Sequence, residues 1–298
     1  MKSENKAFSR RAFMKISAGA LGVSAAAGAC AEDTSSAGSS AAVASGPEIP
    51  NGVQLYCVRH QIEERGLEPL LGELAGIGFQ GVEFADYHGR SAAELRQMLD
   101  GHGLRACGSH VYIETMMGDE RQRSIDFHQA IGNPYVIVRW MDEEMHATRD
   151  DLLRTCEQYN EIAAAIKSYG MRIGYHNHGY IYETYEEGGA TKWDIFADHT
   201  VEDVVLQLDT GNAASHVSPI DVLRRNPGRF ATMHIKPWDP DDPDVFMGED
   251  ALDWDTIIEE ATANGGVDWY IIEYERDAFP PLEALQANLE AFQELRAA

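Results

Sequence analysis

Eight short apolar runs, separated by stretches with helical periodicity, constrain the fold of this chain more than any other feature. Most of the runs have five to seven residues and are apolar throughout. Such runs are typical of strands that are buried on both faces of a parallel sheet. The predicted strands span residues 52–58, 81–84, 105–110, 135–140, 172–176, 204–209, 231–236 and 269–273.

The segments between these runs carry helix signals. Leucines over residues 67–77 form an apolar stripe that ends at Gly78, and Ser91 with Glu94 forms a capping box. Strand and helix patterns alternate through eight units without an internal sequence repeat, which predicts one closed (β/α)₈ barrel of the α/β class. A doubly wound open sheet is the alternative, but no glycine-rich phosphate loop follows any of the runs.

Four polar side chains stand at the ends of the last four predicted strands. They are His176, Asp209, His234 and Glu273. A (β/α)₈ barrel brings the carboxyl ends of all its strands to one face, where its chemistry lies. Two imidazoles and two carboxylates that meet there are typical of a divalent metal site. For any one of these residues alone, a satisfied buried polar group is the alternative.

The first 30 residues are expected to lie outside the barrel. Paired arginines in the segment Ser9-Arg10-Arg11-Ala12-Phe13-Met14-Lys15, followed by a weakly apolar stretch, predict a twin-arginine export signal. The segment Ala27-Gly28-Ala29-Cys30 resembles a lipobox, which would acylate Cys30, and plain cleavage after Ala29 is the alternative. Residues 31–48 are rich in Ala, Ser and Gly and predict a flexible tether. We therefore expect a periplasmic or membrane-anchored protein with a single barrel domain over residues 49–298.

The chain is strongly acidic. Its formal net charge is −25, and because residues 1–29 carry five basic residues and one acidic residue, the remainder carries about −29. Nucleic acid and anionic lipid surfaces are therefore poor partners. Only Lys167, Lys192 and Lys236 are lysines beyond residue 29. This scarcity favours a functional role for Lys236, two residues after His234 on the same face of a predicted strand.

Several segments resemble the sugar phosphate isomerase/epimerase family, whose members are xylose isomerase-like barrels. The opening Val53-Gln54-Leu55-Tyr56-Cys57-Val58-Arg59 is similar to the first strand of that family, and Gly174-Tyr175-His176-Asn177-His178 to the fifth-strand signature of one branch. The likeness extends over residues 51–296. It implies a metal-dependent enzyme with a small carbohydrate substrate, because the family includes isomerases, epimerases and dehydratases of sugars and inositol derivatives.

The resemblance also implies one divalent ion, held by His176, Asp209, His234 and Glu273. Many members have glutamate where this chain has His176. Imidazole binds Mn²⁺, which we expect first, and also Co²⁺, Fe²⁺ or Zn²⁺, whereas this donor set disfavours Mg²⁺. Because the epimerases use two facing glutamates, the histidine removes that symmetrical pair. Isomerisation, epimerisation with another second base, and β-elimination all stay open.

Other residues are candidates for acid–base chemistry and for substrate contacts. Besides Glu273, the acid–base candidates are Lys236, Glu183 and His110. Relatives place a substrate-contacting glutamate near the position of Glu183, with an exposed loop acid as the alternative. Lys236 would transfer a proton or hold a developing oxyanion. The predicted substrate contacts are Glu83, which could also be an extra metal ligand, together with His178, Arg139, Asn212 and Trp238.

These features predict a metal-dependent isomerase or epimerase that enolises an unphosphorylated keto sugar or polyol derivative. A lyase or dehydratase is the alternative, acting by β-elimination on a 3-keto-glycoside or an inosose-like substrate. A non-catalytic sugar-binding barrel is less favoured because candidate acids and bases surround the cluster. An abasic-site-type nuclease is disfavoured by the net charge. The sequence indicates no oligomeric state.

Overall fold

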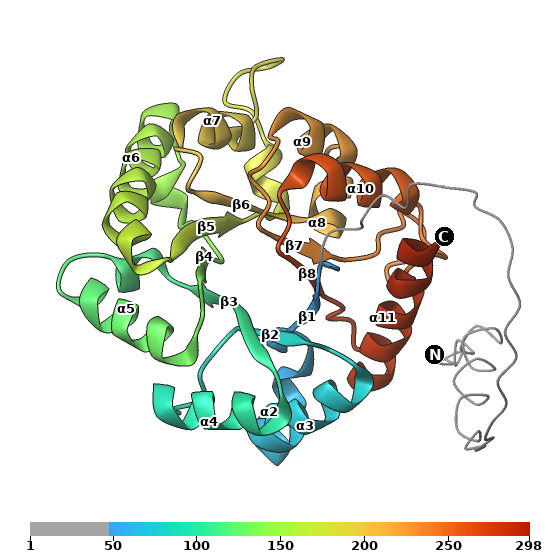
Figure 1. Cartoon of the computed structure of the whole chain (residues 1–298). Coiled ribbons are helices and arrows are strands. Elements are labelled where there is room, and N and C mark those ends of the chain that lie inside the picture. The colour runs from blue at the N-terminus through green and yellow to red at the C-terminus, as the bar shows by residue number, and fades with distance from the viewer. Residues whose placement is uncertain (1–47) are drawn as a thin grey trace, which may run out of the picture. The chain divides into compact units, whose positions relative to one another are not determined.

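The computed structural model describes residues 48–298, in which eight parallel strands close into a barrel (Figure 1). Each strand pairs with the next in sequence, and the first also pairs with the last. The predicted (β/α)₈ barrel is thereby confirmed. The twin-arginine segment, Cys30 and residues 31–47 lie outside the described residues. The strands are β1 (Asn51–Gln54), β2 (Gly81–Phe84), β3 (Arg105–Val111), β4 (Tyr135–Val138), β5 (Arg172–His176), β6 (Val205–Asp209), β7 (Thr232–Ile235) and β8 (Trp269–Ile272).

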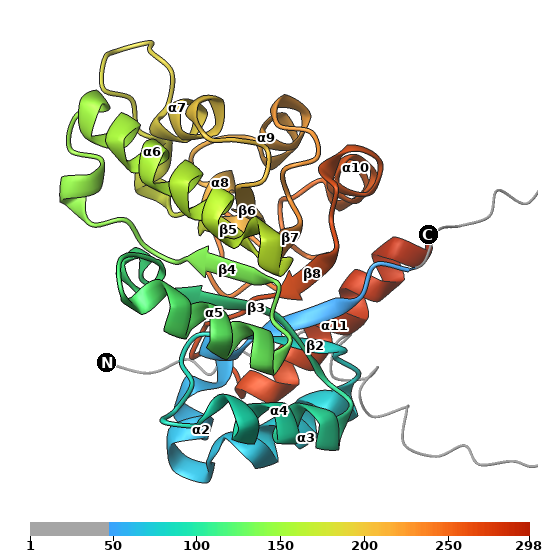
Figure 2. The ribbon, with the colours of Figure 1, turned by 60° about the vertical axis from the view of Figure 1, so that its left-hand side comes forward.

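Helices surround the strands on the outside of the barrel (Figure 1 and Figure 2). Ser91 caps α4 with a capping box, as its spacing to Glu94 predicts. Gly78 ends α3 with a φ of 116°, a left-handed conformation that glycine adopts without steric cost. Among the helices of residues 48–298, none is long and apolar enough to cross a lipid bilayer. The helices are α2 (Arg59–Arg65), α3 (Leu67–Ile77), α4 (Ala92–His102), α5 (Glu120–Ile131), α6 (Arg149–Ile166), α7 (Lys192–His199), α8 (Thr210–Ala214), α9 (Pro219–Arg225), α10 (Trp254–Glu260) and α11 (Pro281–Ala297).

The first strand is shorter than the apolar run predicted. β1 ends at Gln54, and Leu55–Val58 forms a 3₁₀ helix instead of continuing the strand. The side chain of Gln54 accepts a hydrogen bond of 3.0 Å from the backbone N–H of Tyr56, which caps this turn. The run is apolar because the turn is largely buried, so its composition reports burial rather than strand conformation. The turn leaves Tyr56 exposed at the carboxyl end of the barrel.

The interior of the barrel changes from apolar to polar along the strands. Residues near the strand starts, including Val205 and Trp269, belong to a buried apolar cluster. On β6, Gln207 and Asp209 follow Val205 at intervals of two, so all three side chains lie on the same face of the strand. The strands therefore place polar side chains at the carboxyl end of the barrel, beyond an apolar cluster at the strand starts.

A candidate metal centre at the carboxyl end of the barrel

Four side chains from four consecutive strands meet at the carboxyl end. His176 and Asp209 end β5 and β6, His234 lies in β7, and Glu273 directly follows β8. Each offers one donor atom, and these four atoms lie within 4.8 Å of one another. All four side chains are buried. The structure therefore brings together the residues that the sequence analysis selected as metal ligands.

Hydrogen bonds hold the two imidazoles so that each turns one ring nitrogen toward the cluster. His176 Nδ1 lies 2.9 Å from Gln207 Oε1, which leaves its Nε2 facing Asp209 Oδ2 at 4.0 Å. His234 Nε2 lies 2.6 Å from Glu83 Oε2, which leaves its Nδ1 facing Glu273 Oε2 at 2.5 Å. Metal-binding histidines are commonly held in this way, by a carboxylate or carbonyl group at the outer nitrogen.

The protonation of these imidazoles follows from their surroundings. Burial lowers the pKa of His176 well below its usual value, and the neighbouring imidazole of His234 lowers it further. Burial also acts to lower the pKa of His234, but the carboxylates of Glu83 and Glu273 outweigh it and raise the pKa to about 10. A neutral His176 has a lone pair available for a cation at neutral pH, whereas His234 would release its Nδ1 proton as an ion binds.

Asp209 provides the test of whether these residues fit a metal ion. Its Oδ1 accepts a hydrogen bond of 2.7 Å from the backbone N–H of Asn212, whereas its Oδ2 is buried without a hydrogen-bond partner. Burial raises the pKa of Asp209 to about 6, although Lys236 acts to lower it. An unpartnered buried carboxylate oxygen is costly, and a divalent cation would satisfy it. Together with the two imidazoles and Glu273, this oxygen completes a donor set that fits a divalent transition metal.

Lys236 lies against the carboxylates of the cluster. Its Nζ donates to Glu273 Oε1 at 2.9 Å and to Glu275 Oε1 at 2.8 Å, and it lies 3.6 Å from Asp209 Oδ2. Burial acts to lower the pKa of Lys236, but these three carboxylates hold it well above the usual value. The side chain is therefore an ammonium, which cannot ligate a metal. A Cβ at Gly211 would lie 2.9 Å from Lys236 Cγ, so glycine provides the space for the lysine stem.

Glu83, which the sequence suggested as a substrate contact or an extra metal ligand, is buried and anchors the site. Its Oε2 accepts from Gln54 at 2.7 Å and contacts His234 and His110 at 2.6 and 3.1 Å. Its Oε1 accepts from Gln207 at 2.7 Å. Burial acts to raise the pKa of Glu83, but His110 and His234 outweigh it, so the group stays ionised. Protein donors surround this carboxylate, and it does not line the cavity described below.

Gln207 joins the hydrogen bonds that hold His176 and His234 into one network. Its Oε1 lies 2.8 Å from His110 Nε2 and 2.9 Å from His176 Nδ1. Its Nε2 donates to Glu83 and also to Thr232 Oγ1 at 2.9 Å. Gln207 is not among the site residues predicted from the sequence. Gln207 precedes the predicted ligand Asp209 by two positions on β6. Because alternate residues of a strand share a face, this spacing was a signal from which Gln207 could have been predicted.

We expect Gln207→Leu to weaken metal binding by about 10- to 100-fold, the range found when partners of metal ligands are removed. Leucine fills a similar volume but leaves His176 without its acceptor and Glu83 without one donor. The dissociation constant would be measured by competition with a coloured chelator. Gln286→Leu, on α11, is the matched control, since Gln286 donates only to Glu290. An unchanged affinity in folded Gln207→Leu protein would show that the amide does not position the ligands.

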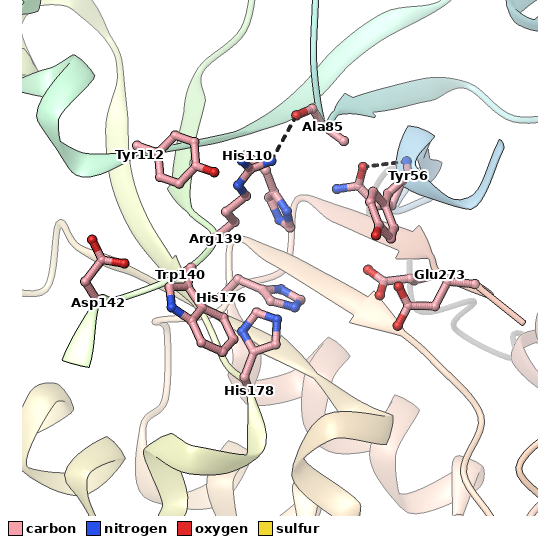
Figure 3. Close-up of a pocket in the computed structure, with 12 residues that line it drawn as sticks. Tyr56, Ala85, His110, Tyr112, Arg139, Trp140, Asp142, His176, His178 and Glu273 are labelled. Atoms are coloured by element: carbon pink, nitrogen blue, oxygen red, sulfur yellow. Dashed lines mark hydrogen bonds between the residues drawn. The ribbon is translucent and has the colours of Figure 1, made fainter. Parts of the chain in front are cut away.

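A cavity of about 560 Å³ opens above the cluster (Figure 3). His110, His178 and Arg139, three of the residues selected from the sequence, line it. Burial lowers the pKa of His178 to about 4, and its Nδ1 is buried without a hydrogen-bond partner. The full lining consists of Gln54, Tyr56, Ala85, His110, Tyr112, Arg139, Trp140, Asp142, His176, His178, Glu273 and Glu275.

Three other predicted residues do not line the cavity. The 3₁₀ helix Gly179–Tyr182 precedes Glu183, whose largely exposed side chain pairs with Lys192 at 2.8 Å, so it is the loop acid of the alternative interpretation. The backbone N–H of Trp238 donates to the Asp250 carboxylate in the loop after β7. Asn212 lies beside the cluster, since its Nδ2 is 3.5 Å from His176 Nε2, the ring nitrogen that faces Asp209.

The closed parallel barrel and the His/Asp/Glu cluster at its carboxyl end define a TIM barrel with a candidate metal centre where such barrels carry their active sites. A family model described as xylose isomerase-like TIM barrel matches residues 71–295. The chain belongs to this family. Members with similar sequences are enzymes, and one of them is an inosose dehydratase from Erwinia tasmaniensis. It is 25% identical over 259 residues, which cover 72% of this chain and 84% of that protein.

Solved structures confirm the fold. A sugar phosphate isomerase/epimerase from Parabacteroides distasonis has a TM-score of 0.69 at 20% identity, covering 80% of this chain and 96% of its own. The IolI protein, solved with a bound zinc atom, has a TM-score of 0.64 at 16% identity, covering 83% of this chain and 97% of its own. At these identities the likeness concerns the architecture of the barrel.

Proposed function

We propose that this protein is a divalent-metal-dependent lyase that enolises a carbohydrate ketone and then eliminates the substituent on the β-carbon. The observation that carries the proposal is the one-sided placement of the base. Glu273 lines the cavity as an ionised carboxylate, whereas the position that many family members fill with a second glutamate holds the neutral His176. The inosose dehydratase relative, whose name describes loss of water from a keto-inositol, supports the same reaction class.

The proposed metal site consists of His176, Asp209, His234 and Glu273. A divalent ion bound there would polarise the substrate carbonyl and stabilise negative charge on its oxygen. The zinc atom in the structurally similar IolI protein supports such an ion. We keep Mn²⁺ as the first ion to test, with Co²⁺, Fe²⁺ and Zn²⁺ as alternatives that suit the same mixed donor set.

Glu273 performs both proton transfers in the proposed reaction. Its carboxylate removes the proton from the carbon next to the carbonyl, and the electron pair left behind forms the enolate. The enolate then expels the β-substituent, which takes the proton back from the Glu273 carboxyl group. The products are an unsaturated ketone and water, or an alcohol where a glycosidic oxygen departs. A single base is sufficient for this sequence, whereas epimerisation needs a proton donor on the opposite face.

The charge around the cavity supports an unphosphorylated substrate. Glu273, Glu275 and Asp142 line it with carboxylates, and Arg139 is the one arginine in its lining. The Arg139 guanidinium is also engaged, since it donates to the backbone carbonyl of Ala85 at 3.4 Å and lies 4.2 Å from the ring centroid of Tyr112. Away from the proposed metal ion, carboxylates outnumber the cationic side chains of the lining, which disfavours a phosphate group there. Neutral hydroxyl groups are suitable partners for these carboxylates.

Incubation of Mn²⁺-loaded protein with inosose and with 3-oxidised sugars in deuterated water, followed by NMR, tests this function. We expect loss of the β-substituent from at least one of these ketones, and we expect chelated protein to be inactive. Deuterium next to the carbonyl without elimination would instead identify an isomerase or epimerase. If the metal-loaded protein gives neither deuterium exchange nor elimination, the proposal is wrong.

A further inference from the structure

Three exposed aromatic side chains surround the mouth of the cavity. Among residues 48–298, the large apolar side chains with substantial exposure are Tyr56 (44%), Tyr112 (52%), Trp140 (44%), Tyr169 (39%) and Val201 (47%). The first three line the same cavity. Exposed apolar groups that gather at one opening indicate a binding surface, whereas scattered ones need no explanation.

Tyr112 and Trp140 form one side of this opening because their strands are neighbours. Tyr112 directly follows β3, Trp140 follows β4 by two residues, and the two strands pair in parallel. In Figure 3 both rings lie with Asp142 on the side of the cavity away from Glu273. We name the group of Tyr112, Arg139, Trp140 and Asp142 the outer subsite.

The rings of the outer subsite are held in place although they are open to solvent. The Arg139 guanidinium lies 4.2 Å from the centroid of the Tyr112 ring. Trp140 lies against His178 and Tyr180, with ring centroids 4.9 and 4.7 Å apart. Because each ring is supported on one side, binding a flat ligand on its free surface costs little side-chain entropy.

The outer subsite is continuous with the metal centre. The His178 ring, which supports Trp140, lies 4.9 Å from the ring of the predicted ligand His176. A series of contacting rings therefore extends from the mouth of the cavity to the cluster. A cavity of about 560 Å³ has the size of sites for ligands larger than one small ring.

Aromatic surfaces next to a carboxylate and a guanidinium match the chemistry of a pyranose ring. The C–H face of the sugar packs on Tyr112 or Trp140, and its hydroxyl groups bond to Asp142 and Arg139. We propose that the outer subsite binds a second sugar ring, so that the substrate is a glycoside whose oxidised ring lies at the metal centre. The inference rests on the proposed function for the identity of the inner ring.

Kinetics with one-ring and two-ring ketones test the outer subsite. The probes are 3-oxidised glucose and cellobiose or maltose oxidised at C3 of the non-reducing ring. We expect the wild-type KM to be about tenfold lower for the two-ring ketones, the size of effect that one or two aromatic contacts give. Trp140→Ala and Tyr112→Ala should remove most of this difference. Tyr169→Ala, an exposed tyrosine before β5 at the other end of the barrel, is the matched control and should retain it.

A further arm separates a sugar from an aromatic group as the outer ligand. A 3-oxidised phenyl glucoside can stack on the rings but offers no hydroxyl groups to Asp142. Asp142→Asn should therefore raise the KM of the two-ring sugar severalfold more than that of the phenyl glucoside. Equal effects on both would assign the subsite to an aromatic group and contradict the second sugar ring.

The outcomes separate this inference from the proposed function. Equal wild-type KM values for one-ring and two-ring ketones would overturn the outer subsite while leaving the lyase in place. If no ketone reacts, the lyase assignment fails, and calorimetric titration with unoxidised cellobiose and maltose decides the subsite. Binding that Trp140→Ala weakens about tenfold would support it. Absence of binding to the wild-type protein would overturn it.

Discussion

Asp209→Asn protein is expected to lose its metal and its activity together. The amide retains an oxygen that can accept from the backbone N–H of Asn212, and asparagine caps helices as well as aspartate does, so the start of α8 should persist. What the substitution removes is the charge of the buried Oδ2, which has no hydrogen-bond partner. We expect less than about a tenth of an ion per chain after dialysis and a fall in kcat/KM of at least about a thousandfold.

Metal analysis by mass spectrometry, in parallel with the elimination assay, would measure both losses. Asp253→Asn is the matched control, because Asp253 caps α10 through the N–H of Thr256 and is exposed. The control should keep its metal and its activity. Asp209→Asn protein with a full equivalent of metal and near-normal turnover would show that the four residues do not form the metal centre.

Lys236→Met is expected to retain metal but to lower kcat by about 100-fold or more at neutral pH. Lys236 lies behind Glu273 and Glu275 and is absent from the cavity lining, so it acts through these carboxylates as a positioning residue. Burial acts to raise the pKa of Glu273, and Lys236, followed by His234, outweighs it and holds the pKa well below the usual value. Without the ammonium this pKa rises, and less of the base is ionised. The acidic limb of the activity profile should therefore move to higher pH.

The pH profile of kcat/KM, measured with metal-loaded protein, tests this role. Lys192→Met is the matched control, since Lys192 is also buried and pairs with the carboxylate of Glu183, at 2.8 Å. Normal turnover with an unmoved acidic limb in Lys236→Met would refute the role given to Lys236. Loss of metal from this variant would instead assign the lysine to the folding of the centre.

The barrel could be predicted because its strands are buried on both faces and its helices carry their own end signals. Burial makes each strand an apolar run, and caps such as Ser91 and Gly78 mark where helices begin and end. The apolar pattern also made the predicted first strand too long. In residues 55–58 a buried 3₁₀ turn has the composition of a strand, and only the side-chain cap from Gln54 distinguishes the two.

The candidate site was predictable where strand geometry determines it. His176, Asp209, His234 and Glu273 are at or beside strand ends, and the barrel brings such positions together. The position of Glu183 depends on the path of a loop, and a loop sequence has no periodicity that predicts where its side chains lie. Asp142, four residues beyond β4, was missed for the same reason, whereas Tyr112 directly follows β3 and was within reach. Glu275, which pairs with Lys236, was within reach because it follows Glu273 by two residues.

Two histidines share the acceptor oxygen of Gln207, and this restricts which residue types are compatible with position 176. Gln207 Oε1 serves both His110 and His176, while its Nε2 serves Glu83. A glutamate at 176 would oppose this oxygen, and turning the amide over would oppose Glu83 instead. Lineages that exchange the histidine for glutamate should therefore also replace position 207, so the two sites are expected to covary among homologues.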